Sequence, residues 1–275
     1  MTRARNALTV RPSATPLGPR SPSPWAVASA RLRRSRASLA GLAVVLALGV
    51  LAGVAPWVAP YDPLAMDLPN QLQPPSANHW LGTDLLGRDI LSRLLYGGRA
   101  TLVTALVAVG ISATLGVALG LAAGFYGGLV DSCLMRLVDV LLAFPRILLA
   151  LTVVALLGVG LGNVMVAVGI AGISGYARIV RGVVLSVREQ PYVEAARLTG
   201  CRTRRILLRH VLPNVMAPII VLATLDIAHA LLSASSLSFL GLGAQPPTPE
   251  WGLMLNEGRA YLRVAPWVTT VPGVT

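Results

Sequence analysis

The sequence predicts an all-α protein that crosses a membrane several times. Of its 275 residues, 55% are hydrophobic and only 12% are charged, and the mean hydropathy is +0.69. A soluble domain of this length needs a polar shell, so this composition indicates that lipid is the main solvent. Aromatic residues are scarce, and the apolar mass is Leu, Val, Ala, Ile and Gly, which suits helices that pack closely in lipid.

Five apolar stretches are long enough to cross a hydrocarbon core of about 30 Å, which takes about 20 helical residues. They cover 39–59, 101–124, 137–160, 162–184 and 215–241. Glycine and proline inside them are tolerated better than in soluble helices. In the second stretch, small residues recur every four positions and predict a packing seam on one helix face: Ser112, Gly116, Gly120 and Gly124.

A sixth apolar stretch begins near the end of the sequence. Nine residues follow Pro266, and that length is too short to cross a bilayer. We therefore expect five complete transmembrane helices with a truncated sixth.

The arginines predict the orientation, because the cytoplasmic loops of membrane proteins are enriched in positive charge. Residues 1–36 carry eight arginines and no acid, which predicts a basic, disordered cytoplasmic tail ahead of a transmembrane domain over 37–275. With this tail inside, the loops 125–136 and 185–214 are inside as well. The inner side then holds 18 of the 23 arginines, in a multi-pass protein of the cytoplasmic membrane. Anionic membrane lipid accounts for the net charge of +12, so no nucleic-acid partner is expected.

Enzymatic chemistry is not expected. The chain has no lysine, so it cannot carry a phosphate-binding P-loop, and any ATP must be hydrolysed by another subunit. The three histidines are scattered, no Cys/His cluster has the spacing of metal ligands, and neither cysteine has an activating partner. We predict that the protein is not an enzyme and binds no metal or cofactor.

The inner loop at 189–214 is the most informative segment. Pro191 can begin a helix, the E-A-A run at 194–196 continues it, and Gly200 breaks it at a turn or a close approach. A second amphipathic stretch leads to Pro213, at the start of the next span. This pattern predicts a helix–turn–helix at the inner membrane surface. On physical grounds alone, a loop that binds membrane lipid accounts for it.

A second interpretation comes from resemblance. The spacing of the E-A-A run, Gly200 and the pair Leu212-Pro213 resembles the E-A-A loop signature of binding-protein-dependent ABC importer permeases. The ending R-H-V-L-P-N, with His210 and Asn214, is similar to the dipeptide, oligopeptide and nickel branch. Further segments resemble that branch in the same order: G-T-D-L-L-G-R-D-I-L-S-R-L-L-Y-G (82–97), Y-G-G-L-V-D (126–131), R-L-V-D-V-L-L-A-F-P (136–145) and L-S-F-L-G-L-G-A-Q-P-P-T-P-E-W-G (237–252).

This resemblance implies the type I ABC importer permease fold and solute translocation by alternating access. The implied cargo is a di- or oligopeptide, ahead of nickel or another small solute. The implied partners are a second, homologous permease, separate ABC ATPase subunits and an extracytoplasmic substrate-binding protein. The residues that the resemblance assigns to ATPase coupling are Glu194, Ala195, Ala196, Gly200, His210, Leu212 and Pro213.

Two ionisable residues lie inside the last complete span. Asp226 and His229 are three positions apart and so share a helix face on a possible translocation path. They could form a proton relay, but we favour a polar contact between helices or the lining of a water-filled cavity. The resemblance implies an acidic residue near Ala234, which this chain lacks. A proton-carrying pair would favour an ion-driven secondary transporter, and the short last stretch leaves open a non-functional fragment of an importer subunit.

The outer segment 82–99 carries two opposite-charge pairs at i,i+4 spacing. They are Asp84 with Arg88 and Asp89 with Arg93, on a helix that Thr83 could cap. A salt-bridged surface helix accounts for this pattern, and a face toward the binding protein or the partner permease is compatible with it.

Overall fold

The structure is a computed structural model that describes residues 36–275. The described residues form helices and no strand beyond an isolated bridge between Thr83 and Asp89, so the all-α prediction is confirmed. By its contacts the chain divides into two units, Met1–Ala47 and Leu48–Thr275. The predicted basic tail at 1–36 lies, except for Arg36, outside the described residues.

In the described part of the chain, four helices are long and apolar enough to cross a membrane, and they overlap four of the predicted spans. The first is α2 (Arg36–Val58), and α3 (Ile90–Tyr126) and α6 (Leu161–Arg188) follow. The last, α9 (Leu212–Phe239), continues without a break from the short α8 (Thr203–Ile206) through one π-helical turn, η2 (Leu207–Val211). The extra length at its start carries the spanning helix directly into the inner loop.

The span predicted at 137–160 is not one helix. It is built from α4 (Gly128–Ala143) and α5 (Arg146–Leu157), whose axes differ by 94°. The break lies at Phe144-Pro145, because a residue before proline is driven out of the helical region, and Phe144 has an extended backbone with ψ 137°. Much of the loop predicted at 125–136 is therefore helical, and the described part of the chain has four spans, or five with the bent pair counted.

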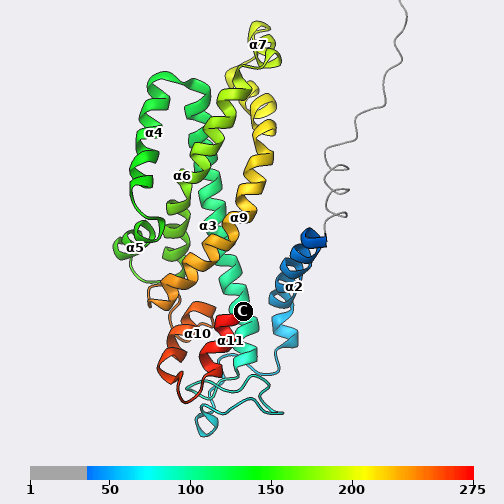
Figure 1. Cartoon of the computed structure of the whole chain (residues 1–275), viewed down its shortest axis with the longest axis vertical. Coiled ribbons are helices and arrows are strands. Elements are labelled where there is room, and N and C mark those ends of the chain that lie inside the picture. The colour runs from blue at the N-terminus through cyan, green and yellow to red at the C-terminus, as the bar shows by residue number, and fades with distance from the viewer. Residues whose placement is uncertain (1–35) are drawn as a thin grey trace, which may run out of the picture. The chain divides into compact units, whose positions relative to one another are not determined.

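The predicted small-residue seam is the contact between α3 and α6, which run side by side (Figure 1). A Cβ at Gly120 would lie 2.6 Å from the carbonyl oxygen of Ala177, and Ser112 Oγ donates a hydrogen bond of 2.7 Å to the carbonyl of Gly169. The backbones approach because no side chain intervenes, and the hydroxyl finds a partner across the interface. The packing interpretation is confirmed.

Within residues 48–275, the short helix α7 (Pro191–Leu198) lies at one end, and α10 (Trp251–Gly258) and α11 (Trp267–Val274) lie at the other (Figure 1). Single-turn helices η1 (Leu68–Asn70) and η3 (Arg259–Tyr261) complete the described elements. A satellite apolar cluster joins α3, α10 and α11 and contains Ile90, Trp251, Met254, Ala265 and Val268.

Candidate functional site

The helix α7 begins where the sequence predicts. Pro191 occupies its first turn, where the missing N–H has no partner to lose, and Gln190 precedes it with an extended backbone. Val193 and Ala196 face inward and are buried, whereas Glu194 and Ala195 are exposed. Of the two alanines assigned to coupling, only Ala195 therefore lies on the free face of α7, beside Glu194.

Gly200 closes α7 with a Schellman turn. Its φ is +76°, a conformation that favours glycine, and a Cβ there would meet no atom within 4 Å. The N–H of Cys201 bonds the carbonyl of Ala196 at 3.1 Å, and the N–H of Gly200 bonds that of Arg197 at 2.9 Å. The glycine is thus required by the turn, and the described part of the chain makes no close approach to it.

The other residues assigned to coupling lie where η2 becomes α9. His210 is half-buried with its ring 6.5 Å from that of Tyr192, and its carbonyl accepts a hydrogen bond from Asn214. Leu212 is half-buried and Pro213 is exposed. The structure therefore brings His210 toward α7, while Leu212 and Pro213 lie at the entry of the span.

Cationic side chains attach this inner end to the spanning helices. Arg197 of α7 lies over the ring of Phe125 at 5.2 Å, and Arg188 donates a hydrogen bond of 2.9 Å to the carbonyl of Gly124. Arg181 binds Asp131 of α4 through two hydrogen bonds of 2.5 and 2.6 Å. These contacts join α7 to the end of α3, and α6 to α3 and α4.

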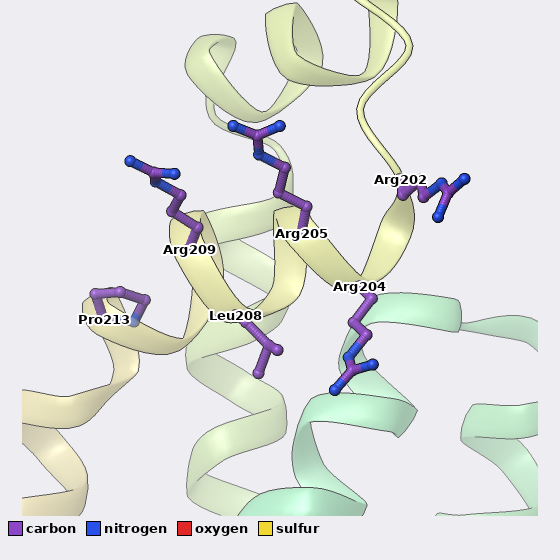
Figure 2. Close-up of a pocket in the computed structure, with 6 residues that line it drawn as sticks. All are labelled: Arg202, Arg204, Arg205, Leu208, Arg209 and Pro213. Atoms are coloured by element: carbon purple, nitrogen blue, oxygen red, sulfur yellow. The ribbon is translucent and has the colours of Figure 1, made fainter.

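A hollow of about 520 Å³ adjoins the turn after α7. Four arginines line it together with Leu208 and Pro213 (Figure 2): Arg202, Arg204, Arg205 and Arg209. Figure 2 shows Arg205 and Arg209 on one side of the helix, and Arg204 and Leu208 directed to the opposite side. The four arginines thus lie within one short segment at the start of this helix.

Asp226 points inward from α9 and forms an ion pair with Arg146. The distance from Arg146 Nη1 to Asp226 Oδ1 is 2.6 Å, and the Asp226 side chain is 6% exposed against 35% for Arg146. Arg146 is the first residue of α5, directly after the break in the third span. The sequence alone did not reveal this partner, because Arg146 and Asp226 are 80 positions apart and the break in the third span brings them together.

The same cluster contains further polar atoms. Among the described residues, Arg146 Nε and Nη2, Asp226 Oδ2 and the hydroxyl of the buried Tyr176 have no hydrogen-bond partner. His229 does not join the cluster: it is exposed, and its Nδ1 lies 3.1 Å from the carbonyl oxygen of Leu225. Asp226 and His229 therefore do not contact each other, and Asp226 makes the interhelical contact that we favoured.

The outer charged segment is a buried network. Arg88 Nε lies 2.6 Å from Asp84, and Arg88 and Arg93 both donate to Oε2 of Glu257 in α10, at 3.1 and 2.9 Å. Both arginine side chains are only 1% exposed, so the prediction of a surface helix was wrong. The network joins the segment before α3 to α10, two regions that are far apart in sequence.

Two details of the outer prediction are corrected as well. The helix begins at Ile90, and its cap is Asp89, whose carboxylate accepts from the N–H and hydroxyl of Ser92 at 2.8 Å. Asp89 pairs with His79 at 3.0 Å, whereas Arg93 pairs with Glu257 at 2.9 Å and with Asp84 at 3.4 Å. Thr83 is no cap, since its hydroxyl donates to the carbonyl of Asn70 at 2.6 Å.

The fold is that of an ABC importer permease. Inward-facing structures of the MetNI methionine ABC transporter share the fold over 67% of this chain and 88% of theirs, with a TM-score of 0.53 and 18% sequence identity. The chain belongs to the family of binding-protein-dependent transport system inner membrane components, whose pattern matches residues 116–274. A second pattern, the N-terminal TM domain of oligopeptide transport permease C, matches residues 23–75.

Curated relatives match nearly the whole chain. The dipeptide transport system permease protein DppC of Alkalihalophilus pseudofirmus is 43% identical over 91% of this chain and 83% of that protein. The glutathione transport system permease protein GsiD of Escherichia coli is 46% identical over 92% of this chain and 84% of that protein. The chain is thus the permease subunit of an ABC importer, a multi-pass membrane protein that is not itself an enzyme. ATPase and substrate-binding subunits work with permeases of this family.

Proposed function

We propose that this permease carries di- or oligopeptides across the cytoplasmic membrane, paired with a second, homologous permease. The cargo class is supported by the relatives, which are named for dipeptide and glutathione transport. Glutathione is itself a short peptide, so both names indicate cargo with peptide bonds and a free carboxylate.

The geometry of the inner loop supports the part of the proposal that concerns coupling to the ATPase subunits. Glu194 and Ala195 form a free face on α7, and the helix from Thr203 to Phe239 runs without interruption from the loop through the membrane. An ATPase subunit that seats on α7 moves the loop, and a continuous helix carries that motion to the pathway. ATP-driven closure of two ATPase subunits then opens the translocation pathway to one side of the membrane and closes it to the other.

Asp226 and Arg146 belong to the translocation path in this proposal. Their ion pair joins α9 to the bent third span, and ionisable groups inside membrane spans commonly mark a substrate pathway. His229, exposed on the same helix, faces either the pathway or the second permease.

We further propose that the N-terminus is cytoplasmic, as the arginine distribution predicts. On a background in which Cys133 and Cys201 are replaced, a cysteine at the exposed Ser76 should react with an impermeant thiol reagent in intact cells. A cysteine at the exposed Ser186 should react only after permeabilisation. Labelling of the second position in intact cells contradicts the orientation.

Uptake in cells tests the function. Deletion of this chain should abolish uptake of a labelled dipeptide, and re-expression should restore it. Depletion of ATP with the proton gradient intact should stop the restored uptake. Uptake that continues without ATP and stops with the gradient identifies an ion-driven transporter and refutes the proposal.

A further inference from the structure

We propose that Arg204 and the apolar row below it bind an anionic phospholipid, with the phosphate on the guanidinium and an acyl chain along α9. The inference rests on the hollow in Figure 2 and is independent of the cargo.

Four arginines elsewhere on the inner half of the protein form ion pairs with acids of this chain: Arg146, Arg178, Arg181 and Arg188. Arg197 lies over the ring of Phe125 instead, and no acid of the described residues pairs with Arg136. Among the described residues, no acid pairs with any arginine of the hollow, and their side chains make no hydrogen bond.

Four unpaired guanidinium groups within eight residues destabilise one another. Arg205 and Arg209 are one helical turn apart on one side (Figure 2), and like charges at this spacing repel. No acid lies in the first turn of α8, where negative charge would offset both the arginines and the helix dipole. An external anion is the group that relieves this repulsion.

The surface below Arg204 selects an anion that carries a hydrocarbon chain. At four-residue intervals, Arg204 is followed by Leu208, Leu212, Met216 and Ile220. Leu208 is 52% exposed, Met216 39% and Ile220 49%, so the row is open along its length, with Leu212 half-buried. A cation at the top of an apolar ridge on a spanning helix complements a phospholipid: phosphate at the interface and chain in the hydrocarbon.

Arg204, rather than the pair Arg205 and Arg209, is the principal phosphate ligand. Figure 2 shows the Arg204 and Leu208 side chains on the same side of the helix, which is the side of the apolar row. The other arginines raise the local positive potential and concentrate anionic lipid near the site without contacting the same molecule.

The experiment measures lipid on the purified importer complex by native mass spectrometry. Phosphatidylglycerol is titrated against wild type, Arg204→Gln and Arg205→Gln, with phosphatidylcholine as the zwitterionic reference. Arg204→Gln should weaken phosphatidylglycerol binding by about tenfold, because one charge-assisted contact is lost. Arg205→Gln removes the same charge from the adjacent residue and should weaken binding by no more than roughly threefold. Leu208→Ser should weaken binding of long-chain phosphatidylglycerol and leave a short-chain form unaffected.

Three outcomes overturn the proposal. Equal losses in the two arginine variants show diffuse attraction without a site. Displacement of phosphatidylglycerol by inorganic phosphate at comparable concentration identifies a free-anion site instead of a lipid site. Loss of the ATPase subunits from the Arg204→Gln complex, with lipid retained, assigns the hollow to the ATPase contact.

Discussion

Glu257 holds together the buried network that joins the segment 82–99 to α10, and its neutralisation should destabilise the protein. In wild type, Arg88 and Arg93 are matched by two carboxylates, Asp84 and Glu257. Glu257→Gln leaves two guanidinium groups, each 1% exposed, with a single carboxylate between them. Loss of one partner from a buried ion pair costs about 3–5 kcal/mol, and because glutamine keeps an acceptor oxygen we expect the lower end, about 3 kcal/mol.

The magnitude is measured as the midpoint of thermal unfolding of the protein in lipid nanodiscs. At about 2–4 °C per kcal/mol for a chain of this size, Glu257→Gln should lower the midpoint by roughly 6–12 °C. The control is Glu189→Gln: its partner is Arg188, but its side chain is 73% exposed, so we expect a change of at most about 1 kcal/mol.

A second variant tests the charge argument itself. Adding Arg93→Met to Glu257→Gln restores one arginine to one carboxylate, Arg88 to Asp84. The double variant should therefore be more stable than Glu257→Gln alone, by about 1 kcal/mol or more. If Glu257→Gln unfolds at the wild-type temperature, or if the double variant is the least stable, the network does not act through buried charge.

Two further predictions concern the membrane-spanning core. Gly116→Ala puts a methyl group 2.5 Å from a side-chain carbon of α6, so α3 and α6 must separate. The amount of folded protein, measured by fluorescence-detected gel filtration, should fall by about tenfold. Gly110→Ala is the control, because its methyl group meets nothing within 4 Å, and it should match wild type. Asp226→Asn leaves Arg146 without its carboxylate and should lower the free energy of unfolding by about 2 kcal/mol in the thermal unfolding assay. Asp139→Asn is the control: the Asp139 side chain is 61% exposed in its ion pair, so the loss should be less than about 0.5 kcal/mol. Equal yields of the two glycine variants, or equal stability of the two aspartate variants, would contradict these assignments.

Elements governed by local sequence were predictable. The helices α3, α6 and α9 follow from unbroken apolar stretches, and the seam on α3 follows from the four-residue spacing of its small residues. The start of α7 at Pro191 and its end at Gly200 follow from backbone geometry, since proline suits a first turn and glycine a positive φ. Each of these features depends only on neighbours a few positions away.

Features that depend on distant partners were not predictable in the same way. The i,i+4 spacing predicts Asp84 with Arg88, but it pairs Arg93 with Asp89 and cannot reveal Glu257, which lies 164 positions from Arg93. The pairing of Arg146 with Asp226 likewise depends on the bend. A signal for that bend was present at Pro145, yet proline is also tolerated inside unbroken membrane helices, so the sequence alone does not distinguish the two outcomes.

The exposed face of α7 is equally a product of folding. The E-A-A run does not distinguish Ala195 from Ala196. Only the packing of the loop against α6 shows that the side chain of Ala195 is exposed and that of Ala196 is buried. Bulk added at Gly200 would strain the turn whatever the partner, because its φ is +76°. Ala195 is therefore the position at which added bulk reports on the contact alone.

Recovery of the ATPase subunits with tagged permease variants, at matched expression, tests the coupling surface most directly. Glu194→Arg reverses the charge on the free face of α7, and Ala195→Trp adds bulk beside it; both should reduce ATPase recovery and ATP-dependent dipeptide uptake by about tenfold or more. Ala77→Trp adds the same bulk at an exposed alanine far from α7 in the sequence and should behave as wild type. If α7 only binds lipid, Glu194→Arg should strengthen membrane contact and leave the ATPase in place. Wild-type recovery and uptake in both α7 variants would contradict the assignment of this helix as the ATPase contact.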